Sequence, residues 1–190
     1  MNELYQQFEN ITLTGRLCYI FMCIEKYLVT LYPQKDWTPV AKRMWQWTNS
    51  EDLEIADDIY NQAIPECILE FDTYEETNSR AYDNNLKKED YDEITACFEG
   101  ITTGNSNDEI CQILMIPSKF MSLCMYNSFF YVEKYTLEFL NCIIMILNRH
   151  SILLPDMTLI SKFRFDRNHC HEIDKWGRCV NTEYLSIILK

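Results

Sequence analysis

Apolar side chains recur at helical spacing along most of this chain. Between residues 14 and 31 they fall every three or four positions: Leu17, Ile20, Phe21, Ile24, Tyr27, Leu28 and Leu31. This spacing gathers apolar groups on one face of a helix. Pro33 follows, and proline cannot continue a helix because it lacks a backbone N–H. The pattern therefore predicts an amphipathic helix that ends near Leu31.

Start signals mark further helices. Thr38 followed by Pro39 is typical of a helix N-terminus, and Val40, Met44 and Trp47 then share one face. Comparable patterns predict helices over 51–64, 88–98, 109–116 and 131–149, and a short helix with a polar bend within 65–78. For the helix over 109–116, Ser106 with Glu109 resembles a capping box.

The helix predicted over 131–149 is the most apolar of these. Leu140, Ile143, Ile144 and Leu147 form one stripe, which Met145 and Ile146 widen. Lys134, Glu138 and Asn141 form a narrow polar strip on the opposite side. A helix that is apolar around most of its circumference is typically buried. We expect this helix to be the central one.

The last forty residues have a different pattern. Lys162 to Phe165 alternate as in a strand, Trp176-Gly177 is typical of a tight turn, and residues 183–189 form a final helix or strand. The four glycines of the 190 residues leave little room for β-turns elsewhere. The sequence predicts a mostly α protein, a single helical domain over 1–190, with a small β-hairpin near the C-terminus.

The nine cysteines favour reduced thiols. Their number is odd, their spacing is irregular, and Cys18, Cys23, Cys97 and Cys142 lie in apolar helical runs. The first ten residues lack the basic and apolar regions of a signal peptide, and the longest apolar run, 139–147, is too short to cross a bilayer. We expect a cytoplasmic protein without a membrane partner.

The net charge of −12 is concentrated in one quarter of the chain. Residues 51–99 hold 16 acidic and 3 basic side chains, a net of −13, and the remaining residues hold 13 acidic and 14 basic, a net of +1. Such a chain is poorly suited to binding nucleic acid through its phosphates. It suits a basic partner, whose association the field would accelerate.

The segment His169–Cys179 contains the residue types of a metal site. It holds two histidines and two cysteines within eleven residues. Structural zinc sites use pairs of ligands two to four residues apart with a second pair at a distance, whereas His169 and His171 are separated by one residue and Cys179 has no neighbouring ligand. Polar hairpin residues without a ligand are the favoured interpretation. A metal-binding module or metal-dependent enzyme remains the alternative.

Other catalytic motifs are absent from the sequence. It has no Gly-x-Ser-x-Gly elbow and no glycine-rich phosphate loop, and no local context marks a cysteine as activated. Adjacent acids such as Asp57-Asp58 point about 100° apart on a helix, so they do not form dyads by themselves. We expect a non-enzymatic protein without a cofactor.

Two aromatic residues are candidate binding anchors. Trp45 falls off the stripe of Val40, Met44 and Trp47 and stands near Arg43, so we expect it to be the exposed tryptophan. Tyr74 lies among acidic residues. For Trp37 and Trp47, packing in the core is the favoured interpretation.

Three segments resemble a family of small bacterial immunity proteins of polymorphic toxin and contact-dependent inhibition systems. They are Trp37 to Thr48 (WTPVAKRMWQWT), Glu66 to Asn78 (ECILEFDTYEETN) and Glu183 to Leu189 (EYLSIIL). The resemblance is clearer in the first half and looser at the C-terminus, and its motifs are helical segments without catalytic residues. It implies a predominantly α-helical, cytosolic, non-enzymatic protein that neutralises a toxin domain, frequently a nuclease. It carries over no toxin-contacting residues.

The sequence therefore predicts an inhibitor that binds a basic toxin domain through an acidic surface. The predicted contact residues are Glu51, Asp52, Asp57, Asp58, Asp72, Glu75 and Glu76, with Trp45 and Tyr74 as anchors. An acidic helical regulator, or a mimic of nucleic acid, has the same charge pattern and remains a second alternative.

Overall fold

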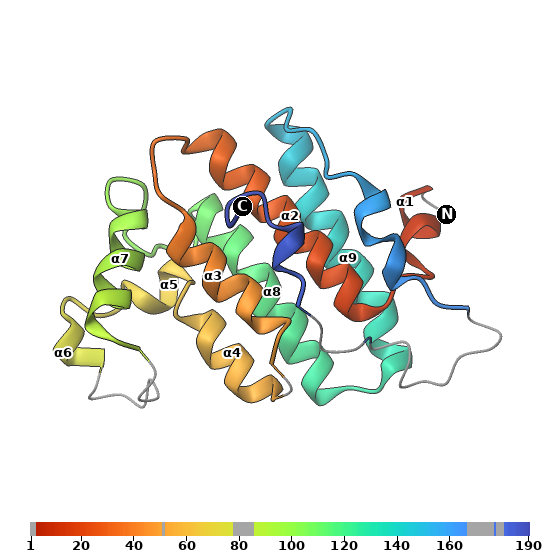
Figure 1. Cartoon of the computed structure of the whole chain (residues 1–190), viewed down its shortest axis with the longest axis horizontal. Coiled ribbons are helices and arrows are strands. Elements are labelled where there is room, and N and C mark those ends of the chain that lie inside the picture. The colour runs from red at the N-terminus through yellow and green to blue at the C-terminus, as the bar shows by residue number, and fades with distance from the viewer. Residues whose placement is uncertain (1–2, 51, 78–85, 167–176, 178–180) are drawn as a thin grey trace.

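The computed structural model describes residues 3–50, 52–77, 86–166, 177 and 181–190 (Figure 1). Its α-helices are α1 (Glu3–Phe8), α2 (Leu13–Leu31), α3 (Thr38–Trp47), α4 (Leu53–Asn61), α5 (Pro65–Ile68), α6 (Tyr74–Thr77), α7 (Lys88–Phe98), α8 (Glu109–Tyr126) and α9 (Phe129–Arg149). Two 3-10 helices follow, η1 (Met157–Phe163) and η2 (Glu183–Leu185). The predicted mostly α class is confirmed. None of these helices, within the described ranges, is long and apolar enough to cross a bilayer.

The predicted strand at Lys162–Phe165 is wrong. Residues 157–163 form η1, whose three-residue turn buries both Ile160 and Phe163, and the Asp156 carboxylate caps it by accepting from the Thr158 N–H. Arg164 forms an isolated antiparallel bridge with Ile11. Of the predicted hairpin, residues 167–176 and 178–180 lie outside the described residues. The φ of +91° at Gly177 fits the turn expected there.

Helix α2 occupies the centre of the molecule (Figure 1). It packs against α3, α8, α9 and η1. Its predicted stripe is buried from Leu17 to Leu28, and the charged side chains of Arg16 and Glu25 on the same helix are buried as well. Gly15 allows η1 to approach closely, because a Cβ there would lie 2.5 Å from the Cβ of Phe163.

Helix α9 is not the central helix that the sequence predicts. Its stripe of Leu140, Ile143, Ile144 and Leu147 is buried against α2 and α8, but Met145 is 57% exposed and Cys142 is exposed. Only one face of α9 is covered by its neighbours.

Helix α8 starts at Glu109 as predicted, but its cap and its C-terminal end differ from the prediction. Its N-cap position is Asp108 rather than Ser106, and the helix continues through Pro117 to Tyr126. A proline inside a helix costs one backbone hydrogen bond. Burial of Ile116, Pro117, Phe120 and Met121 on the same helix offsets that cost.

The buried guanidinium of Arg16 joins three helices. Its Nε donates to the Phe8 and Ile11 carbonyls at 3.2 and 3.1 Å, which ties the end of α1 to α2. Its Nη1 donates to the Glu133 carbonyl at 2.7 Å and to Thr136 Oγ1 at 2.8 Å, both on α9. A buried charge is tolerated only when its donors are satisfied, so Arg16 specifies where α1 and α9 dock.

We predict that Arg16→Met lowers the free energy of unfolding by about 3 kcal/mol, because it removes the buried hydrogen bonds that the guanidinium donates to the Phe8, Ile11 and Glu133 carbonyls. Urea denaturation measures this change. Lys119→Met on the exposed side of α8 is the matched control and should change stability by less than about 0.5 kcal/mol. Equal effects of the two variants would contradict the assigned role of Arg16.

Candidate functional site

The acidic residues of 52–99 divide into two groups in space. Asp52, Asp57 and Asp58 belong to α4, which packs on α3 and α8. Asp72, Glu75 and Glu76 belong to α6 and the turn before it, which packs on α7 at one end of the molecule (Figure 1). Glu51 lies outside the described residues. The predicted surface is therefore not one continuous patch of these residues.

The α6–α7 group forms around two tyrosines. Tyr91 OH donates to the Phe71 carbonyl at 2.8 Å, Tyr74 OH donates to the Leu86 carbonyl at 3.1 Å, and the two rings lie 6.1 Å apart. These contacts hold α6 against α7. Tyr74, predicted as an anchor, is half-buried and first of all a packing residue.

Four exposed carboxylates surround this tyrosine pair. Burial raises the pKa of Tyr91, and the negative charges of Glu76, Asp92, Asp72 and Glu75 raise it further. A phenol loses its proton less easily beside negative charge, and all four carboxylates contribute to this effect at Tyr91. We call Asp72, Glu75, Glu76 and Asp92 the α6–α7 acidic group. Asp92 is a member that the sequence prediction missed, although it lies within the acidic quarter.

Among the described residues, several basic side chains contact groups at this end of the molecule. Arg43 Nη2 lies 2.9 Å from Asp90 Oδ2, which joins α3 to α7. Lys88 Nζ lies 4.0 Å from Glu75 Oε1, and both side chains are more than half exposed, so this pair is weak. Lys35 Nζ donates to the Ala96 and Glu99 carbonyls at the end of α7. Within the described ranges, Arg43 and Lys35 contact α7 outside the α6–α7 acidic group, and Lys88 pairs with one of its members.

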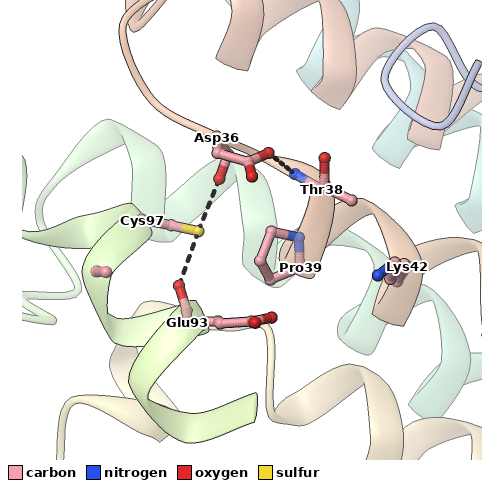
Figure 2. A pocket seen from close by; sticks show the side chains of 7 residues that line it. Asp36, Thr38, Pro39, Lys42, Glu93 and Cys97 are labelled. Atoms are coloured by element: carbon pink, nitrogen blue, oxygen red, sulfur yellow. Dashed lines mark hydrogen bonds between the residues drawn. The ribbon is translucent and has the colours of Figure 1, made fainter. Parts of the chain in front are cut away.

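A pocket of about 360 Å³ opens between the start of α3 and α7 (Figure 2). Carboxylates of Asp36 and Glu93 line it, with Lys42 on the α3 side. Hydrogen bonds from Thr38 hold the pKa of Asp36 below its usual value. The pocket can therefore accept a cationic group.

Cys97 lines the same pocket but is not a nucleophile. Its thiol lies 3.1 Å from the Asp36 carbonyl and 3.3 Å from the Glu93 carbonyl, to which it donates (Figure 2). Burial, assisted by the charge of Asp36, raises its pKa to about 11. A thiol with this pKa stays protonated at neutral pH, so the pocket favours binding over covalent chemistry.

Trp45 is not the exposed tryptophan that the sequence predicts. It is fully buried, and its Nε1 donates to Glu25 Oε1 at 2.7 Å. Trp45 is therefore unavailable as a binding anchor. Trp45 is buried because α2 packs against a second side of α3. The spacing of apolar residues along α3 does not predict this contact.

The carboxylate of Glu25 connects α2, α3 and the C-terminal segment. Besides Trp45, Glu25 accepts from Ser186 Oγ at 2.5 Å and from the Ile187 N–H at 2.6 Å. Ser186 Oγ in turn accepts from the Ile188 and Leu189 N–H groups. Burial raises the pKa of Glu25, and these three donors oppose the shift. This carboxylate holds the segment predicted as a final helix or strand.

We predict that Glu25→Ala lowers the free energy of unfolding by about 3 kcal/mol, because three buried donors lose their acceptor. Amide exchange at Ile187 should accelerate, which hydrogen-exchange mass spectrometry detects. Thr30→Ala, an exposed position on the same helix, is the control. Unchanged exchange at Ile187 in the Glu25 variant would contradict this role.

Helices α2, α8 and α9 meet at a cluster around Glu109. Arg149 Nη1 donates to Glu109 Oε2 at 2.6 Å, and His150 Nε2 and Tyr27 OH contact Oε1. A histidine beside a carboxylate is common in acid–base catalysis. Here both Glu109 oxygens are bonded to protein donors, so the cluster ties helix ends together. Sequence reasoning missed it because Glu109 and His150 lie 41 residues apart.

The described residues contain no group of three or more potential metal ligands. The segment His169–Cys179 lies outside them apart from Gly177, so the alternative metal site stays a prediction. Free thiols are found at Cys18, Cys23, Cys97, Cys111, Cys124 and Cys142. No family model, curated protein or solved structure matches this chain.

Asp57 differs from the other acids of the predicted surface. It is half-buried, its Oδ2 accepts from Asn61 Nδ2 at 3.3 Å, and its Oδ1 is buried without a hydrogen-bond partner among the described residues. Burial raises its pKa, which the Asn61 hydrogen bond opposes and the charge of Asp58 reinforces. Asp57 faces the protein more than the solvent.

We predict that Asp57→Asn raises the free energy of unfolding by up to about 1 kcal/mol at pH 7. The pKa of Asp57 is higher in the folded protein than in the unfolded chain. The wild-type protein therefore loses stability as rising pH removes the proton from this carboxyl group, and the neutral asparagine avoids that loss. The gain should therefore disappear below about pH 4. Thermal unfolding across pH tests this, with exposed Asp58→Asn as the control. A gain that persists in acid would contradict the assignment.

Proposed function

We propose that this chain is a non-enzymatic immunity protein that binds and neutralises a basic toxin domain of the nuclease type. The observation that carries this proposal is the convergence of Asp72, Glu75, Glu76 and Asp92 at one end of the fold. A nuclease must bind phosphates and is usually basic, so an acidic inhibitor complements its surface.

The proposed contact surface is the α6–α7 acidic group together with the pocket between α3 and α7. A lysine or arginine of the toxin would place its cationic head between Asp36 and Glu93, while the four carboxylates attract the surrounding basic surface. Asp52 and Asp58 on α4 would add to the long-range field without direct contact. The resemblance of residues 37–48 and 66–78 to immunity proteins supports the same interpretation.

We predict that Asp72→Lys with Asp92→Lys slows association with the toxin domain encoded beside this chain's gene by about tenfold or more at low salt. Stopped-flow fluorescence measures the rate, and its salt dependence should weaken. The control, Glu54→Lys with Asp58→Lys, makes the same charge change on α4. It should slow association less.

Equal slowing by both variant pairs would mean that only net charge matters, and would contradict the assigned surface. Absence of binding by the wild-type chain, together with no protection of cells that express the toxin domain, would contradict the proposed function. Binding of a basic housekeeping protein instead would favour the acidic regulator.

A further inference from the structure

The outward face of α9 carries a regular stripe of side chains that the described residues leave largely exposed, with Tyr135 half-buried. Its members alternate at spacings of four and three residues: Tyr131, Tyr135, Glu138, Cys142, Met145 and Arg149. At 3.6 residues per turn they fall within an arc of about 80°. Tyr131 is 45% exposed and Met145 57%, whereas Leu140 and Leu147 on the opposite side are fully buried.

This stripe has the pattern of a coiled-coil seam rather than of a solvated face. Alternation of four and three residues places side chains along the line where two helices meet. Four of its six members are aromatic or sulfur-containing. The rings of Tyr131 and Tyr135 are already stacked, with centroids 4.4 Å apart. An exposed apolar stripe of this regularity indicates a helix–helix contact.

We propose that α9 pairs with α9 of a second copy of this chain, antiparallel and about a two-fold axis near residue 140. In such a pair each position meets the one equally far on the other side of the axis. Tyr131 then faces Arg149 of the second copy, Tyr135 faces Met145, and Glu138 faces Cys142. The second contact is a sulfur–aromatic pair, while Arg149 stays paired with Glu109 of its own chain.

Charge favours a second copy as the occupant. Helix α9 contains Glu133, Glu138, Lys134 and Arg149, a net charge of zero, although the whole chain carries −12. The antiparallel register places no like charges opposite one another. The α6–α7 acidic group lies at another end of the molecule (Figure 1), so two copies can meet along α9 without bringing their negative ends together.

The exposed apolar residues beyond α9 fit the same register. Tyr126 is 79% exposed just before the helix, and Leu153 and Leu154 are 82% and 37% exposed just after it. Tyr126 and Leu154 are equally far from residue 140 in sequence. An antiparallel pair therefore brings the Tyr126 end of each copy to the Leu153–Leu154 end of the other.

The test is the oligomeric state of the full chain by sedimentation velocity over a range of micromolar concentrations. The contact surface is small, so we expect a reversible dimer of micromolar affinity. Met145→Glu should weaken dimerisation at least about tenfold. Asn148→Glu, exposed on the same helix about 100° from the centre of the stripe, should not. Circular dichroism checks that both variants fold.

Crosslinking tests the orientation. Tyr135→Cys and Met145→Cys, each combined with Cys142→Ala, are mixed and treated with a short bismaleimide. Antiparallel pairing gives crosslinks between the two variants above the background of Cys142→Ala alone. Crosslinks only within each variant would overturn the proposal, as would a monomer at all concentrations or a dimer that Met145→Glu leaves intact. Because no toxin is present, these outcomes are independent of the proposed function.

Discussion

The burial of charged groups on α2 is the constraint on which the arrangement of the other helices depends. A charge removed from water must be matched by protein groups, or the folded state loses several kcal/mol. Arg16 finds its acceptors on α1 and α9, and Glu25 finds its donors on α3 and the C-terminal segment. Four segments far apart in the chain are thus oriented by two side chains of one helix. Apolar packing around α2 supplies stability, and these two groups add specificity of docking.

The charged residues outside α2 are distributed unevenly over the fold. Helices α5, α6 and α7 place many of the acidic residues of the 51–99 segment at one end of the fold, where Tyr74 and Tyr91 pack α6 against α7. Lys35 donates to the Glu99 carbonyl at the end of α7, and Arg43 pairs with Asp90 on the same helix. These two contacts join α7 to the segment around α3. Helix α9 has no net charge. One molecule thus presents an acidic surface suited to a basic protein and a neutral helical face suited to its own copy.

Sequence patterns succeeded where one helix face met one core. The start of α2 and the bounds of α7 follow from apolar spacing and from the residues at the helix ends. Predictions from these patterns failed where a residue packs against a further part of the structure that its own helix face does not indicate. Trp45 lies off its stripe yet is buried by α2, and Pro117 stays helical because its neighbours are buried on both sides of it. The apolar composition of α9 indicated burial, but Met145 and Cys142 on its second face are exposed in the part of the chain that the structure describes.

By itself the sequence determined the helical class, the positions of most helices and the confinement of negative charge to one quarter of the chain, because these depend on neighbours within a few residues. Only the tertiary structure decided which acids share a surface and which helix is central. It joined Asp92 to Asp72, Glu75 and Glu76, turned Asp57 toward the protein, and placed Glu109 beside His150. Such juxtapositions depend on how helices dock. Docking is decided by buried partners many residues apart, and local patterns do not record them.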